Sequence, residues 1–348
     1  MSRCALKVVL DHPNKACVAG EKVTGRIEVS VVDDCECQEL SLVRRWRTRG
    51  RGEDDFGPAQ KQTVFSGSWR GGQRAFYPFE FTAPPGPLSY RGASFSVEWY
   101  LRAQAALAGA LDAATDEEFF LVPAAETQAF NLGPAFRGAE SHQKLLQLGQ
   151  SVVRGCMVFT GGLFLFFSLL FGFYVRDVFR KTPVAGPEQW SALVVWFLIL
   201  GASGALFIWA VRPLIAARKL GRVAVQVTPV FVRPGQSVTC TVNLQPRGDI
   251  HLIEAQATLR GMEVVQWQSG DDTHSHRTVI RAESVKFAAD RELSAGQSAT
   301  LETQLTIPPD APTTFMAAHN SLLWLIEVKL YLKGWPDWQR EFPVIVRP

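Results

Sequence analysis

Several features that would indicate a secreted protein are missing from this sequence of 348 residues. Six cysteines are scattered along the chain without the spacing of a disulfide framework. The first fifteen residues contain a short apolar run that is interrupted by Lys7 and Asp11, and they lack the long apolar stretch of a secretory signal. From these two absences we expect the N-terminal domain to stay in the cytoplasm.

Charge and catalytic motifs are also sparse. A formal charge of +3 does not indicate a polyanionic partner, and no nucleic acid is expected. The sequence contains no serine elbow, phosphate-binding glycine loop, HExxH or dinucleotide-binding pattern. His319 and Asn320 stand beside an apolar run, and we interpret them as closing a loop rather than as members of a triad. The sequence therefore predicts a protein that is not an enzyme, with no catalytic residues and no cofactor.

Two short pairs contain residue types that bind metals. One is the C-x-C pair of Cys35 and Cys37, and the other is the H-x-H pair of His274 and His276. A closed zinc site normally needs four ligands, and no second pair lies at a standard spacing. We interpret each pair as a surface turn and predict no metal site, beyond a weak adventitious one that the histidines could form with Asp272.

Two long uncharged runs dominate the middle of the chain. Residues 155–175 and 190–211 contain no charged side chain, and each is long enough to cross roughly 30 Å of hydrocarbon as a helix. The segment between them, 176–189, contains Pro183 and Pro187, which suit a turn between antiparallel helices. The sequence predicts a transmembrane helical hairpin with both large domains on one side.

Basic residues near the ends of the two runs suggest an orientation, because positive charge is more frequent on the cytoplasmic side. More of them lie outside the hairpin than in its loop, which predicts an integral membrane protein with two passes and both termini in the cytoplasm. Small residues spaced by four positions would let helix backbones approach closely, within the hairpin or between subunits of a homo-oligomer: Ser168, Gly172, Gly201 and Ala205.

Outside these runs, apolar residues alternate with polar ones, as in half-buried strands. In residues 22–31, for example, Val23, Ile27 and Val29 fall on one face, and Gly25 keeps the register. Glycine, proline and aspartate clusters separate the segments, as in antiparallel sandwiches. The predicted strands are 22–31, 40–47, 76–81, 95–101, 238–244, 255–265, 301–307 and 325–332.

The two halves of the chain also match each other. GEKVTGRIEV (20–29) aligns with GQSVTCTVNL (235–244), and FEFTAPPGP (79–87) aligns with TQLTIPPDAP (303–312). An apolar strand follows each proline pair, and we align residues 97–101 with 326–330. We therefore predict a duplicated sandwich. The predicted boundaries are 1–125 for the first sandwich, 126–154 for a linker, 155–211 for the hairpin and 212–348 for the second sandwich.

The run FTAPPGPLSYRGASFSVEWYLRAQA resembles the arrestin-like domain. The features shared with that family are a proline-rich turn, a Tyr and Gly pair and a Val-x-Tyr-x-Leu strand: here Pro84, Pro85, Tyr90, Gly92, Val97 and Leu101, with Trp99 where the family often has Tyr. The second half has Phe315, Met316 and Ala317 in place of the Tyr and Gly pair. The resemblance implies a mainly β protein with two immunoglobulin-like or arrestin-like antiparallel β-sandwiches that bind proteins without catalysis. Arrestins join their sandwiches by a short linker, whereas here the predicted hairpin separates them.

A row of arginines provides one candidate binding surface. In an extended strand, alternate arginines project to one face and could contact lipid phosphates, a phosphorylated partner or nucleic acid: Arg45, Arg47, Arg49 and Arg51. The alternative is an ordinary solvated face that is balanced by the acidic residues 53–55. Among the functional readings, anionic lipid headgroups are favoured.

These patterns together suggest a non-enzymatic, membrane-anchored scaffold or adaptor that presents two cytoplasmic β-sandwich binding domains at the bilayer. Its expected partners are membrane lipids and unidentified cytoplasmic proteins. The alternative is a membrane-disrupting or pore-forming effector whose hairpins oligomerise. A membrane-tethered hydrolase is a third hypothesis, for which the sequence offers no nucleophile motif.

Overall fold

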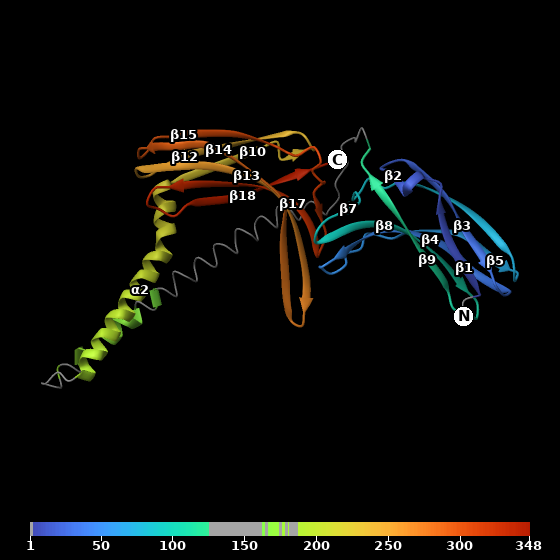
Figure 1. Ribbon diagram of the computed structural model, residues 1–348, viewed down its shortest axis with the longest axis horizontal. Helices are drawn as coiled ribbons and strands as arrows, with labels where there is room; N and C mark the ends of the chain where they lie inside the picture. The colour runs from blue at the N-terminus through green and yellow to red at the C-terminus, as the bar shows by residue number, and fades with distance from the viewer. Residues whose placement is uncertain (1–2, 125–161, 164–165, 174–175, 178–179, 181–186) are drawn as a thin grey trace.

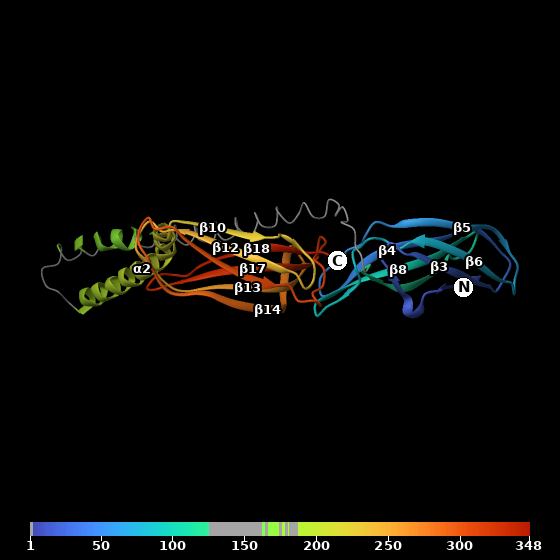
Figure 2. The same cartoon turned by 90° about the horizontal axis from the view of Figure 1, so that it is seen from above.

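The computed structural model describes residues 3–124, 162–163, 166–173, 176–177, 180 and 187–348. The protein is mainly β and has two similar halves, each made of two β-sheets (Figure 1). The halves lie end to end when the molecule is seen from above (Figure 2). The predicted mainly β class with two sandwich halves is confirmed, whereas the predicted linker 126–154 lies outside the described residues.

In the first half, a three-stranded sheet faces a six-stranded one. The strand orders are β1-β3-β6 and β2-β9-β8-β4-β5, and the short β7 pairs with β8. The bounds are β1 (Cys4–Leu10), β2 (Ala16–Val18), β3 (Lys22–Val31), β4 (Cys35–Gly50), β5 (Gln60–Trp69), β6 (Arg74–Thr82), β7 (Tyr90–Arg91), β8 (Phe95–Leu107) and β9 (Ala113–Val122), with a 3-10 turn η1 (Pro13–Lys15).

The second half repeats this arrangement. Its strand orders are β10-β12-β15 and β11-β18-β17-β13-β14, and the short β16 pairs with β17. The bounds are β10 (Arg222–Thr228), β11 (Phe231–Val232), β12 (Ser237–Gln245), β13 (Ile250–Ser269), β14 (Asp272–Leu293), β15 (Ala299–Thr306), β16 (Phe315–Met316), β17 (Asn320–Leu332) and β18 (Trp338–Val346).

All eight predicted strand segments lie in observed strands, to within one residue at their ends. The alternation in β3 fixes which face is inward, because Val23, Ile27 and Val29 are buried in the first core. Gly25 shares that face. A Cβ there would lie 2.6 Å from the ring of Phe79, so glycine leaves room for the facing aromatic ring.

Two tryptophans fix how the halves correspond. The indole Nε1 of Trp99 donates to the carbonyl of Pro87 at 2.7 Å, and Trp324 donates in the same way to Pro312 at 2.9 Å. Each acceptor lies twelve positions before its tryptophan. Trp99 therefore corresponds to Trp324, and the predicted alignment of 97–101 with 326–330 is wrong by four positions.

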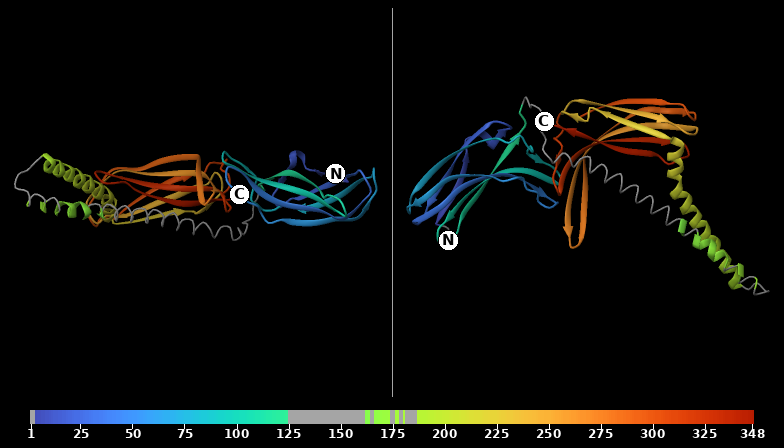
Figure 3. Two further views of the ribbon diagram at one scale, coloured as in Figure 1. Left: turned by 90° about the horizontal axis from the view of Figure 1, so that it is seen from below. Right: turned by 180° about the vertical axis from the view of Figure 1, so that it is seen from behind.

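The hairpin of β13 and β14 is unusually long, with 20 and 22 residues in its strands. Its distal part projects from the second sandwich beside the end of the first (Figures 1 and 3). Two bulges in β14 each insert one extra residue opposite β13, at Ile280 and at Phe287. Both extra side chains are apolar and pack against buried clusters, so the bulges turn them inward.

The second apolar run is helical, as predicted, and belongs to α2 (Pro187–Leu220). The described residues of the first run are also helical and pack against α2, where the indole of Trp196 donates to the carbonyl of Ser168 at 2.8 Å. Gly172 allows this contact, because a Cβ there would lie 2.6 Å from the Trp196 ring. A Cβ at Gly201 would meet nothing within 4 Å, so that glycine is not needed for the contact.

The predicted membrane location needs a correction. Within the described ranges, no helix combines the length and the apolar character that crossing a membrane requires. The prediction of an integral membrane protein with two passes and both termini in the cytoplasm is therefore wrong on this finding. A long uncharged run of sequence therefore does not by itself place this chain in a membrane.

Candidate functional site at the junction of the two sandwiches

The arginines of the predicted basic row are only partly available to an anion. Pairing with β8 places three of them on one face of β4, and the fourth follows the end of the strand: Arg45, Arg47, Arg49 and Arg51. Arg47 is paired with Glu98 at 3.2 Å and Glu118 at 3.3 Å, and only 15% of its side chain is exposed. The row is therefore interrupted at Arg47. Contact of the other arginines with headgroups or phosphates stays a prediction.

The two candidate metal-binding pairs lie in different halves of the fold, on β4 and on β14. Cys35 and Cys37 are buried in the first core, so the prediction of a surface turn is wrong for this pair. His274 and His276 are exposed on β14, and the ring of His274 stacks on Trp267. Across the part of the chain that the structure describes, no group of three or more His, Cys, Asp or Glu is placed to hold a metal.

The buried thiols are expected to resist alkylation until the protein unfolds. Burial raises the pKa of Cys17, Cys37 and Cys240 to about 11 in each case. Only about one thiol in a thousand is then a thiolate at pH 8, and the fraction grows as the pH rises towards 11. We expect iodoacetamide at pH 8 to modify these cysteines at least about 100-fold faster in urea than in buffer. Mass spectrometry of timed samples measures both rates, and equal rates would contradict this burial.

The end of the first sandwich holds a buried carboxylate from the second. Glu263 on β13 is fully buried and accepts three hydrogen bonds across the junction. The donors are the Tyr90 hydroxyl at 2.6 Å, the Ala93 amide at 2.9 Å and the Ser94 amide at 2.6 Å. Burial, reinforced by the hydrogen bond to Glu263, raises the pKa of Tyr90 far above its ordinary value. The phenol therefore stays a donor at neutral pH.

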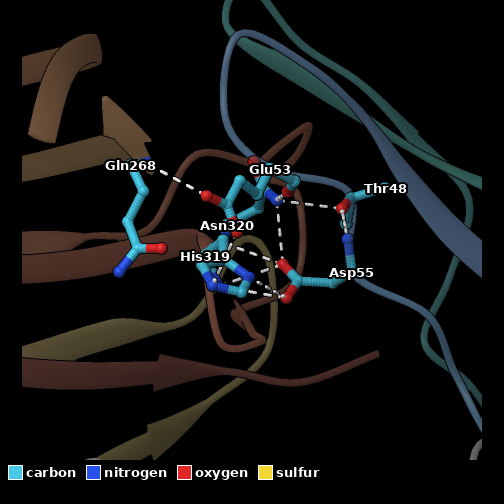
Figure 4. A network of polar contacts seen from close by, with 6 residues as sticks. All are labelled: Thr48, Glu53, Asp55, Gln268, His319 and Asn320. Atoms are coloured by element: carbon cyan, nitrogen blue, oxygen red, sulfur yellow. Dashed lines mark hydrogen bonds and ion pairs between the residues drawn. The ribbon is translucent and has the colours of Figure 1, made fainter. Parts of the chain in front are cut away.

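A second carboxylate crosses the junction in the opposite direction (Figure 4). Asp55, in the loop after β4, is 7% exposed and accepts from the backbone amides of His319 at 3.1 Å and Asn320 at 2.9 Å. The Asn320 amide group adds a bond at 2.8 Å, and His319 Nδ1 lies 3.0 Å away. Thr48 accepts from the Asp55 amide at 2.7 Å, which holds the loop in place. Glu53 extends the network to the Gln268 amide at 2.9 Å.

An apolar cluster also joins the two sandwiches. Its buried members come from both sandwiches: Phe95, Val97, Val265, Phe315 and Leu322. The ring of Phe315 lies 5.9 Å from that of Phe95, and it meets Trp46 edge-on at 5.5 Å. Burying such side chains contributes roughly 1.5–3 kcal/mol each as an upper estimate. The sandwiches are therefore held together by apolar burial as well as by hydrogen bonds.

The amide donors of the junction occupy equivalent positions in the two halves, whereas the carboxylates do not, since Glu263 lies on β13 and Asp55 lies in the loop after β4. Ser94 and His319 immediately precede β8 and β17, and each donates its amide to a carboxylate of the other half. Tyr90 and Phe315 also correspond, since they pair with the equivalent residues Val97 and Leu322. Duplication has therefore brought two related surfaces face to face.

Sequence reasoning found part of this site. Tyr90 and Gly92 belong to the motif that resembles the arrestin-like domain, but their partner was not identified. The alternation within 255–265 places Glu263 on the same face as the buried Leu259 and Val265. A charged residue on a buried face is rare unless it is paired, so this position indicates a buried partner for the carboxylate. Asp55 gave no such signal, because it stands in an acidic loop that was read as balancing the arginines.

Comparison with known proteins adds little to this description. No family model and no curated protein matches the chain. Among solved structures, it is similar to Spo0M, a sporulation control protein from Bacillus subtilis, at 16% identity and a TM-score of 0.30. That alignment covers 36% of this chain and 49% of the other, which is about half of its length. A match at this score carries no argument about function.

Proposed function

We propose that this chain is a non-enzymatic scaffold or adaptor in which two β-sandwiches act as one rigid binding unit for partner proteins. The observation that supports this proposal is the junction. Two buried carboxylates and an apolar cluster fix the sandwiches to each other, so surfaces on both halves keep a constant separation. A fixed separation lets a two-domain protein bind partners in a defined geometry, because the two domains do not lose relative freedom each time a partner binds.

Cross-linking followed by affinity capture of the full chain tests the proposal. We expect the wild-type protein to recover a discrete set of proteins. A variant that loosens the junction, Gly92→Ala, should lose those that touch both halves. Gly248→Ala is the matched control, because a Cβ there makes only ordinary contacts with the flexible side chain of Lys219. Recovery of no protein above background, or the same set from both variants, would count against a rigid scaffold.

A further inference from the structure

The turn from Tyr90 to Ser94 has the form of an anion-binding nest. Successive backbone N–H groups in a tight turn converge on one point, where they favour a negatively charged group. Here the amides of Ala93 and Ser94 point at the two oxygens of Glu263, one at each, and the Tyr90 hydroxyl adds a second donor to Oε1. All three donors are uncharged, so the backbone and a phenol hold this carboxylate in the interior.

Glycine at position 92 is what leaves space for the bound group. A Cβ on Gly92 would overlap Oε1 of Glu263, and it would lie 2.6 Å from the Tyr90 hydroxyl. The backbone at this residue is not in the left-handed region, so glycine is required here by close approach rather than by conformation. The nest therefore has room for a carboxylate only because residue 92 has no side chain.

The donor geometry selects the chemical class of the ligand. The two amides contact different oxygens, which suits the planar, two-oxygen shape of a carboxylate. The equivalent end of the second sandwich also holds a carboxylate, since the successive amides of His319 and Asn320 bind Asp55. Ser94 and His319 occupy corresponding places before β8 and β17, so each sandwich presents a backbone amide to a carboxylate at this end; the second amide precedes Ser94 in one case and follows His319 in the other.

We propose that the Tyr90–Ser94 nest is a carboxylate-binding site that Glu263 fills as an internal ligand. An external carboxylate, such as an acidic side chain of a partner, binds there when the Glu263 side chain is withdrawn. This proposal rests on the same junction as the scaffold role, but the two can fail separately, because acetate binding is measured on the chain alone without any partner protein.

Chemical rescue of the full chain tests the site. In Glu263→Ala, the nest keeps its donors and loses its ligand, so acetate should bind in the vacated space. At an acetate concentration ten times its Kd, the folded-to-unfolded ratio should rise about tenfold relative to chloride at the same ionic strength. Adding Tyr90→Phe to this variant removes one donor and should weaken acetate binding several-fold. Thermal unfolding followed by circular dichroism gives these ratios.

The controls make each outcome decisive. Leu301→Ala loses a buried side chain of the second core, far from the nest, and should unfold alike in acetate and chloride. If Glu263→Ala fails to fold in chloride, refolding in acetate replaces the titration, and recovery only in acetate supports the site. Equal effects of acetate and chloride, or refolding in neither, would overturn the proposal. Stronger stabilisation by inorganic phosphate than by acetate would overturn the assignment to carboxylates.

Discussion

Substitution of Gly92 by alanine is expected to lower the free energy of unfolding by at least about 3 kcal/mol. The added methyl group would occupy the position of Glu263 Oε1, so the carboxylate must leave the nest. Its departure removes three hydrogen bonds and leaves the amide of the buried Ser94 without an acceptor. Because the nest joins the sandwiches, we also expect calorimetry to resolve two unfolding transitions for this variant and a single transition for the wild type.

The comparison with Gly248→Ala separates this effect from the general effect of replacing a glycine. At Gly248 the nearest atoms to a new Cβ belong to Lys219, at 3.6–4.0 Å, and that side chain can move aside. Its free energy of unfolding should change by less than about 1 kcal/mol. A Gly92→Ala protein that unfolds like this control would show that Glu263 is not held as described.

Truncation of Asp55 to alanine should have the second-largest effect, a loss of about 3 kcal/mol in the free energy of unfolding. Asp55 is the acceptor for the amides of His319 and Asn320, and its loss would leave the amide of the buried Asn320 without a partner. The neighbouring Asp54→Ala is the matched control, since Asp54 is exposed and should change stability by no more than about 0.5 kcal/mol. Urea unfolding curves give both values.

Combining the two junction substitutions tests whether both carboxylates serve one interface. Once Gly92→Ala has separated the sandwiches, the amides near Asp55 are already exposed to water, so Asp55→Ala should cost less than it does alone. The double variant should therefore be more stable than the sum of the single changes predicts. Strict additivity would indicate that the two networks stabilise their own halves independently.

Strands were predictable from this sequence because their signal is local. Val23, Ile27 and Val29 alternate within one segment, and burial of that face decides both the element and its orientation. The alignment of the two halves was less certain for a physical reason. A strand repeats every two residues, so sliding 97–101 by four positions preserves the inward face, and only the Trp99 and Trp324 hydrogen bonds fix the register.

The junction was not predictable because its partners are distant in the sequence. Tyr90 and Glu263 are 173 positions apart, and Asp55 and Asn320 are 265 apart. A motif can indicate that Tyr90 and Gly92 belong to a functional turn, but it does not identify the residue of the other half that contacts them. Glu263 also had a readable signal, because it places a charge on the buried face of an apolar strand.

The reciprocal arrangement of the junction also bears on how this protein can be divided. A polypeptide that covered only one half would carry a nest without its carboxylate, a carboxylate without its donors, and one side of the Phe95–Phe315 aromatic contact open to water. Each fragment would thus be incomplete in a way that only the other fragment can correct. Separately produced halves are expected to associate without a covalent link, as in fragment complementation. Neither half alone reproduces the junction of the intact chain.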